Sequence, residues 1–233
     1  MLDLNLDPYL YRKAFAEDGR LQIQPFLQDS DARTIRSCLD SEVPWTLACR
    51  QSGQSRTLKR EEYAELSDDQ RQSLLHELAQ QSKGTYGFAY ESYMMVKAYK
   101  EGADPNLLLH RILEYLNSEE FLFFARSITG IDAIRRVSAQ ATRYRSGHFL
   151  RTHNDHEPSE GRQAAYVINL TQGWKSDWGG LLHFTDDGGK VVDTFHPSWN
   201  TLSLFRVPQP HFVSAVHGCA EADRLAITGW FEA

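Results

Sequence analysis

The stretch VSAQATRYRSGHFLRTHNDHEP, residues 137–158, opens the part of the chain that decides the fold. It contains two short runs rich in β-branched and aromatic residues, and six more follow, each bounded by turn residues, as is typical of strands. The eight runs are VSAQATRYR, HFLRT, AAYVINL, LLHFT, KVVDTF, TLSLFRV, HFVSAV and RLAITGWF. Eight short strands after a helical layer predict a double-sheet jelly roll or barrel with helices packed against one sheet.

The chain before residue 133 is predicted to be mainly helical. Its expected N-caps are Asp29 or Ser30, Ser67, Asp104 and Ser118. Ser67 begins a capping box with Gln70, and Pro105 occupies the favoured first helical position. Gly130 ends the last of these helices. We therefore expect an α+β, mainly β chain that forms a single domain over residues 1–233. Residues 1–132 would be a helical support region with early strands, and residues 133–233 a double-stranded β-helix (jelly-roll) catalytic core.

Three segments between these elements carry turn or loop signals. Asp187-Gly188-Gly189 stands between two predicted strands and indicates a hairpin. Gly179-Gly180 indicates a turn or bulge, because no helix follows that could make it a phosphate cradle. The polar stretch at residues 50–65 is expected to be a surface loop, with a mobile lid over a site as the alternative.

The overall charge excludes one class of partner. The chain has a net charge of −6, whereas a nucleic-acid-binding protein needs a basic patch that neutralises phosphates. It also lacks any apolar run near the roughly 18 residues that a membrane-spanning helix needs. We expect neither a nucleic acid nor a membrane as partner.

The cysteines and the N-terminus bear on location. Cys38, Cys49 and Cys219 are odd in number and widely spaced, which suits reduced thiols and offers no zinc cage. The N-terminal residues MLDLNLDPYLYRK have acids before their basic residues and no apolar core of a signal peptide. The expected location is the cytoplasm.

One spacing within the opening stretch is suited to binding a metal. On an extended strand, residues i and i+2 project to the same face, so His153 and Asp155 can converge on one ion. With 9 histidines and 31 acidic residues in 233, such a triplet is expected about once by chance, so the spacing alone does not identify a metal site. A second histidine would complete a two-His, one-carboxylate set for Fe(II). His211 and His217 both lie on one later run, and strand periodicity does not choose between them.

Further features follow in a fixed order. Tyr144 and Gly147 precede His153, and the WGGLLHF element, the PHFV run and a terminal RLAITGWF come after it. In this combined order residues 137–233 resemble the 2-oxoglutarate/Fe(II)-dependent oxygenases, in their prolyl 4-hydroxylase-like branch. The resemblance implies a jelly-roll enzyme, and the soluble cytosolic prolyl hydroxylases are the members that the N-terminal part resembles more loosely.

The resemblance also implies site residues. His153, Asp155 and His211 would be the metal ligands, with no further catalytic residue beyond them. The interval from His211 to Arg224 is long for the family, which keeps His217 as the alternative. Arg224 would bind the distal carboxylate of 2-oxoglutarate, because a guanidinium matches a carboxylate with two hydrogen bonds and stays charged when desolvated. Tyr144 would donate to the same carboxylate.

Other residues are assigned more loosely. Three of them are candidates to line the cosubstrate pocket: Asn169, Tyr166 and Leu182. Four tyrosines are interpreted as strand packing, with a peptide groove as the alternative: Tyr86, Tyr90, Tyr93 and Tyr99. Trp230 is expected in the core or at the rim of a cleft.

The implied activity is hydroxylation of a C–H bond, with Fe(II) as cofactor and 2-oxoglutarate and O2 as cosubstrates. Ascorbate would be a stimulant, succinate and CO2 the by-products, and the substrate a prolyl residue of a protein or peptide. The alternatives are another amino-acid or small-molecule substrate, a cupin-type metalloenzyme that does not use 2-oxoglutarate, and a jelly-roll binding module without catalysis.

Overall fold

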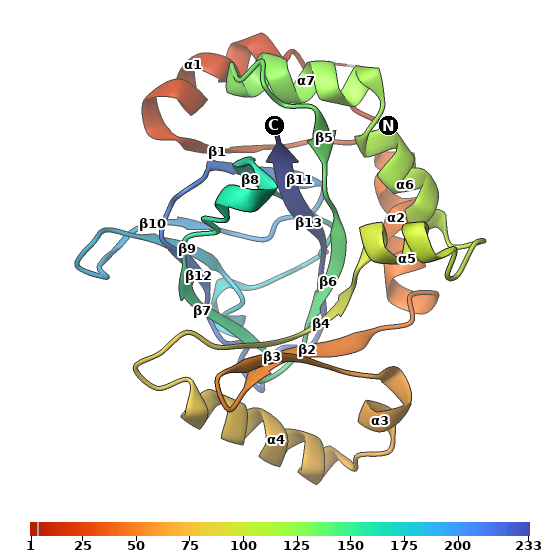
Figure 1. Cartoon of the computed structure of the whole chain (residues 1–233), viewed down its shortest axis with the longest axis vertical. Helices are drawn as coiled ribbons and strands as arrows, with labels where there is room; N and C mark the ends of the chain where they lie inside the picture. Colours follow the sequence, from red (N-terminus) through yellow and green to blue (C-terminus); the bar gives the residue numbers. More distant parts are fainter. Residues whose placement is uncertain (4) are drawn as a thin grey trace.

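One large antiparallel sheet, curled on itself, dominates the computed structural model, which describes residues 1–3 and 5–233 (Figure 1). The strands are β1 Arg20–Ile23, β2 Thr46–Gln51, β3 Gln54–Leu58, β4 Phe88–Tyr93, β5 Arg136–Val137, β6 Gln140–Tyr144, β7 Phe149–His153, β8 Arg162–Asn169, β9 Leu182–Thr185, β10 Val191–Phe195, β11 Thr201–Arg206, β12 His211–Val213 and β13 Arg224–Glu232. The helices are α1 Pro8–Asp18, α2 Asp29–Ser41, α3 Arg60–Ala64, α4 Asp68–Gln81, α5 Met95–Glu101, α6 Leu108–Leu116, α7 Glu119–Thr129 and the 3₁₀ turns η1 Pro158–Glu160 and η2 Ser176–Trp178.

The strand order makes the sheet a nearly closed barrel. Neighbours run β1-β11-β8-β13-β6-β4-β7-β12-β9-β10, so strands far apart in the sequence lie side by side. The two end strands are joined by side chains. Arg20 on β1 donates to Asp193 on β10 at 2.7 Å, and the Gln22 amide donates to the carbonyl of His196 at 3.0 Å. The predicted jelly-roll core with helices packed against it is confirmed.

The first part of the chain supplies strands to this sheet as well as helices. β4 lies between β6 and β7, pairing Glu91 with Arg143 and Phe88 with Leu150. β2 pairs with β4 along residues 89–92 and carries β3 outside it. The barrel around the site is therefore closed by a strand from before residue 133.

The prediction that residues 50–65 form a loop or lid is wrong. The segment completes the β2–β3 hairpin, in which Arg50 pairs with Ser55, and continues into α3. Gln54–Thr57 are exposed and only Leu58 is half-buried. A strand exposed on both faces has no apolar alternation, which is why the sequence showed no strand signal there.

Most of the predicted helix signals are confirmed. Ser67 accepts the amide of Gln70 in a full capping box, and Ser118 accepts the amide of Phe121 at the start of α7. Gly130 ends α7 in the left-handed conformation. The predicted cap of α2 at Asp29 or Ser30 is wrong, because the cap is Gln28, without a side-chain hydrogen bond, and Asp29 and Ser30 lie in the first turn.

The predicted helix start at Asp104 and Pro105 is wrong. Asp104 has φ 48° and its carboxylate accepts the Tyr93 hydroxyl at 3.0 Å, while its carbonyl accepts the Leu107 amide. These contacts close a turn, and α6 begins only at Leu108. The Asp-Pro pair is a turn signal as well as a helix signal, and the tertiary contact with Tyr93 decides between them.

Two glycine-containing turns have the roles that the sequence predicted. Gly189 closes the β9–β10 hairpin by donating to the Asp186 carbonyl at 2.9 Å. Gly179 has φ 70° and ψ −147°, a region open almost only to glycine, and a Cβ there would lie 2.1 Å from the Ala215 carbonyl oxygen. This close approach holds the turn before β9 against the chain that follows β12.

Two apolar clusters hold the helices and the barrel in place. Between the helices and the sheet, Phe121 of α7 packs edge-on against Phe231 of β13 and Phe26. Inside the barrel, Phe184 and Phe205 pack together at 5.2 Å, and Phe205 contacts the ring of His211 at 4.6 Å. Full burial of such a side chain contributes about 1.5–3 kcal/mol, so these rings stabilise the wall of the barrel.

Candidate active site

Two paired strands place two histidines side by side inside the barrel. His153 is the last residue of β7, His211 is the first of β12, and the two are direct partners in the antiparallel ladder. Their ring centroids are 4.2 Å apart. Asp155 lies between them, with one carboxylate oxygen 3.2 Å from His153 Nε2 and the other 3.6 Å from His211 Nε2. One ligand atom from each residue fits within 4.8 Å of the others, a spacing suited to one metal ion.

Asp155 reaches this position by a turn rather than by the pleat of a strand. β7 ends at His153, and Asp155 has φ 58°, in the left-handed region that aspartate tolerates better than most residues. The expected proximity of His153 and Asp155 is therefore found, but the expected extended geometry is wrong.

The hydrogen bonds of the two rings fix which nitrogen faces the carboxylate. Nδ1 of His153 donates to the Arg151 carbonyl at 3.0 Å, and Nδ1 of His211 donates to the Gln209 carbonyl at 2.8 Å. Since each Nδ1 carries the hydrogen, each Nε2 presents its lone pair to the centre of the cluster. Backbone carbonyls commonly orient metal-binding imidazoles in this way.

The protonation states also suit a cation. Burial and the nearby His153 lower the pKa of His211 to about 4, so the ring is neutral near pH 7. Burial alone would raise the pKa of Asp155, but the adjacent imidazoles of His153 and His211 outweigh it and hold that pKa at about 2. A neutral imidazole and an ionised carboxylate are the forms that bind a divalent metal.

His217, the alternative third ligand, lies elsewhere. It is exposed, its Nδ1 accepts the Cys219 amide at 3.2 Å, and its own amide donates to the Trp178 carbonyl. The structure therefore brings His211, and not His217, to His153 and Asp155.

A buried arginine and tyrosine lie deeper in the same cavity. Arg224 on β13 and Tyr144 on β6 are ladder partners, with the guanidinium carbon 5.1 Å from the tyrosine ring centre. Arg224 is 4% exposed and Tyr144 5%. Burial lowers the pKa of Arg224 and raises that of Tyr144, so the ring remains a neutral hydrogen-bond donor.

The guanidinium has unused donors. Within residues 1–3 and 5–233, Nε and Nη1 of Arg224 are buried and have no hydrogen-bond partner. An uncompensated buried charge costs several kcal/mol, and proteins keep such a group mainly where a ligand supplies the partner. Arg224 lines a cavity of about 270 Å³ that is also lined by His153, Asp155 and His211. The site therefore fits a metal beside a small molecule that carries a carboxylate at its far end.

Some of the residues that the sequence assigned loosely to the cosubstrate pocket line the cavity, and one does not. Tyr166 and Leu182 line the cavity. Asn169 does not, because its amide donates to the Thr201 carbonyl and the Ser203 hydroxyl between β8 and β11. Tyr90 is a wall of the cavity and stacks on Tyr144 at 5.1 Å, and Tyr86 packs against His153 at 5.7 Å. These two tyrosines therefore pack against neighbouring rings and also line the cavity.

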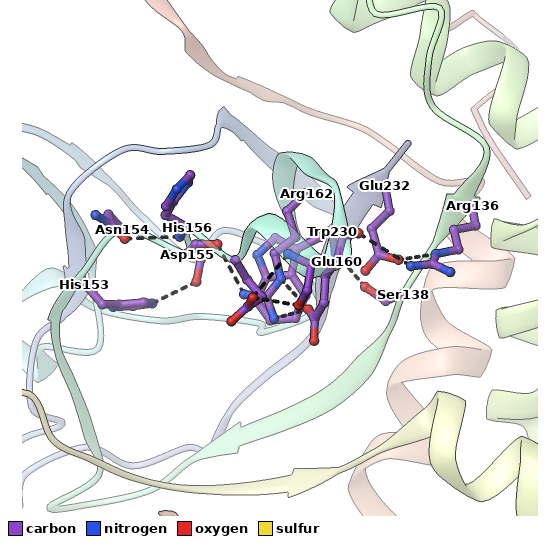
Figure 2. Close-up of polar contacts among 12 residues, drawn as sticks. Arg136, Ser138, His153, Asn154, Asp155, His156, Glu160, Arg162, Trp230 and Glu232 are labelled. Atoms are coloured by element: carbon purple, nitrogen blue, oxygen red, sulfur yellow. Dashed lines mark hydrogen bonds and ion pairs between the residues drawn. The ribbon is translucent and has the colours of Figure 1, made fainter.

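The sequence did not point to Arg162, which connects Asp155 to the end of the barrel (Figure 2). Its guanidinium stacks on the indole of Trp230 at 3.6 Å, donates to the Asp155 carbonyl at 3.3 Å and pairs with Glu160 at 2.5 Å. Each contact comes from a different element, so no local motif could have indicated this role.

Comparisons with known proteins agree with the geometry. Residues 139–232 match the family model of the 2OG-Fe(II) oxygenase superfamily. Over 139 residues, 57% of this chain, the sequence is 32% identical to mouse prolyl 3-hydroxylase OGFOD1, and the match spans 24% of that relative's length.

Solved structures share the fold. A prolyl-4-hydroxylase from Pseudomonas putida matches with a TM-score of 0.61 and 18% identity, covering 97% of this chain and 98% of that one. A Trichoplax adhaerens prolyl hydroxylase, solved with a peptide fragment of a hypoxia inducible factor, matches with a TM-score of 0.63 and 18% identity, covering 97% of this chain and 88% of that one.

Proposed function

We propose that this chain, whose residues 139–232 match the family model of the 2OG-Fe(II) oxygenase superfamily, hydroxylates a prolyl residue of a protein or peptide. The observation that carries the proposal is the buried Arg224, which has unpartnered Nε and Nη1 and lines one cavity with the His153–Asp155–His211 cluster. The carboxylate of an oxoacid cosubstrate would give this cation its partner. Fe(II) is the cofactor of the family, and 2-oxoglutarate and O2 are its cosubstrates.

Each residue of the site has a defined part in this proposal. Nε2 of His153, Nε2 of His211 and the Asp155 carboxylate hold the iron, and a three-ligand set leaves positions open for other ligands. Arg224 and the Tyr144 hydroxyl hold the distal carboxylate of 2-oxoglutarate. When bound, iron, 2-oxoglutarate and O2 together supply the oxidant that converts a substrate C–H bond to C–OH, with succinate and CO2 released.

The rest of the cavity keeps the chemistry dry and oriented. Tyr90, Phe205 and Trp230 wall the site with aromatic carbon, which excludes water from the reacting centre. Arg162 contacts both the Asp155 carbonyl and the Trp230 indole, and it would thereby hold the carboxylate in position for a bound metal.

The prolyl substrate is supported by the relatives, which are named as prolyl hydroxylases, while their shared fold serves more than one reaction.

The test has two stages. Purified protein with Fe(II) should first convert 2-oxoglutarate to succinate, and an Asp155→Ala variant should not. Peptide mass spectrometry of a host-cell lysate incubated with the enzyme should then find one oxygen atom added to proline. Oxygen added only to another residue type would overturn the prolyl part, and no succinate from the wild-type protein would overturn the whole.

Location in the cytoplasm belongs to the same proposal. Cys38, Cys49 and Cys219 are free, and burial raises the pKa of the Cys38 thiol to about 11. Among the helices of the described residues, none has the length and apolarity needed to cross a bilayer. Fractionation of cells that express the tagged chain tests the location.

A further inference from the structure

A second, larger cavity adjoins the catalytic one. Its volume is about 590 Å³, and it lies where the start of α5, the end of α6 and β5 meet. Gln140, Arg162 and Trp230 line both cavities, so the two adjoin at these side chains. Figure 2 shows Arg162 and Trp230 between Asp155 on one side and Glu232 with Arg136, which line the second cavity, on the other.

The catalytic cavity is too small for a polypeptide. Pockets that bury a whole drug-sized ligand measure about 300–1,000 Å³. At about 270 Å³ the catalytic cavity holds 2-oxoglutarate and one reacting side chain. The residues of the substrate on either side of the reacting one must lie outside it, and the neighbouring cavity has the volume to receive a side chain from them.

The second cavity has an apolar lining, part of which the fold leaves exposed. Its apolar members are Met94, Val96, Tyr99, Leu113, Val137 and Ala139. Met94 is 51% exposed and Tyr99 46%, high values for large apolar residues. The Tyr99 hydroxyl donates to Glu114 at 2.9 Å, which holds the ring in one orientation at the rim.

The charges around the cavity cancel. Arg136 pairs with Glu232 at 2.5 Å and Arg162 pairs with Glu160 at 2.5 Å, while Lys100 and Glu114 add one charge of each sign. A balanced rim gives no advantage to a charged ligand over a neutral one. The lining therefore favours a large, uncharged, apolar side chain.

We propose that this second cavity binds a large apolar side chain of the substrate polypeptide. The polypeptide would run from the catalytic cavity across Trp230 to the second cavity. The bound residue lies a few positions away from the hydroxylated one on one side of it. This inference rests on the proposed function, and it adds the residue by which the enzyme selects its substrate.

A peptide library tests the inference directly. Peptides with one fixed central proline and randomised flanks are incubated with the enzyme, Fe(II) and 2-oxoglutarate, and the oxidised members are sequenced by mass spectrometry. One flanking position should be enriched in Leu, Met, Phe or Tyr by roughly tenfold or more, the ratio expected from burying such a side chain.

Charge substitutions at Met94 test whether the second cavity contacts the enriched flanking position of the peptide. Met94→Glu should move the preference at that position to Lys and Arg, and Met94→Lys should move it to Asp and Glu. Both variants should keep wild-type conversion of 2-oxoglutarate without peptide, because Met94 lines only the second cavity. Phe123→Glu is the matched control, since Phe123 is 55% exposed on α7 and lines neither cavity.

The failures are distinguishable. If the wild-type enzyme oxidises peptides without an apolar preference at any flanking position, or if both Met94 variants keep the wild-type profile, the second cavity does not select the substrate. If no peptide is oxidised while succinate still forms, the prolyl or peptide substrate of the proposed function is wrong, and this inference falls with it.

Discussion

Replacement of Arg224 by methionine should have opposite effects on the two properties of the protein. Met keeps the linear side chain but removes the charge and the two buried donors, Nε and Nη1, that have no partner among the described residues. In the ligand-free protein this removes an uncompensated buried cation. Replacing buried ionic groups by apolar ones of similar volume stabilises proteins by about 1–4 kcal/mol. We expect about 2 kcal/mol here, or a rise in Tm of roughly 4–8 °C for a chain of this size.

Binding of 2-oxoglutarate should weaken at the same time. Loss of one partner of a buried, hydrogen-bonded charge pair costs about 2–5 kcal/mol, which corresponds to a KM for 2-oxoglutarate raised about thirtyfold to about 4000-fold. Metal content should stay at the wild-type level, because Arg224 lies outside the His153–Asp155–His211 cluster.

The assay combines succinate production over a range of 2-oxoglutarate concentrations with thermal unfolding of the ligand-free protein. Arg206→Met on β11, an exposed arginine, is the control and should change neither property appreciably. An unchanged KM in Arg224→Met would show that the arginine does not bind the cosubstrate. A marked loss of stability with an unchanged KM would show instead that its role is structural.

Three further predictions address the third ligand, a buried histidine and a glycine. His211→Ala should abolish tight Fe(II) binding while His217→Ala leaves it unchanged, as measured by metal content after dialysis; the reverse result would reassign the ligand. Burial lowers the pKa of His148 from 6.5 to about 4, so the unfolded state binds the proton first. The contribution of His148 to the free energy of unfolding should be complete above pH 6.5 and fall by about 3 kcal/mol towards pH 4. In urea unfolding measured over this pH range, His148→Gln should lack this decrease. Gly179→Ala should lower the free energy of unfolding by more than about 2 kcal/mol, because its Cβ would meet the Ala215 carbonyl. Gly173→Ala, with open space around it, should lower it by about 1 kcal/mol. Equal losses in the two variants would contradict the steric reason.

The sequence predicted the fold where the pattern is local. Caps such as Ser67 and Ser118 act within one helical turn, and the hairpin at Asp187-Gly188-Gly189 is decided by its own backbone. The errors fall where distant contacts decide. Asp104 bonds to Tyr93 and closes a turn instead of starting a helix, and the exposed β3 is held by pairing with β2. Neither contact leaves a trace in local composition.

The site shows the same division between local and tertiary information. The order of Tyr144, His153, Asp155 and Arg224 along the chain indicated which side chains should meet, but strand periodicity left His211 and His217 equal. The ladder between β7 and β12 separates them, because it sets His211 opposite His153. That register follows from packing of the whole barrel, and no property of either histidine expresses it.

Arg162 shows why the proposed substrate selection is harder to predict from the sequence than the proposed metal binding. Metal ligands must be particular residue types at a fixed spacing, so His153 and Asp155 are conspicuous even in one sequence. Arg162 acts by position: it pairs with Glu160, covers Trp230 and holds the Asp155 carbonyl, and one side chain thereby joins the metal site to the second cavity. Because the same arginine lines both cavities, a substrate residue that packs against it also contacts the group that orients Asp155. Occupation of the second cavity and the geometry of the metal site are therefore physically connected, and selection of a substrate can act on the chemistry as well as on affinity.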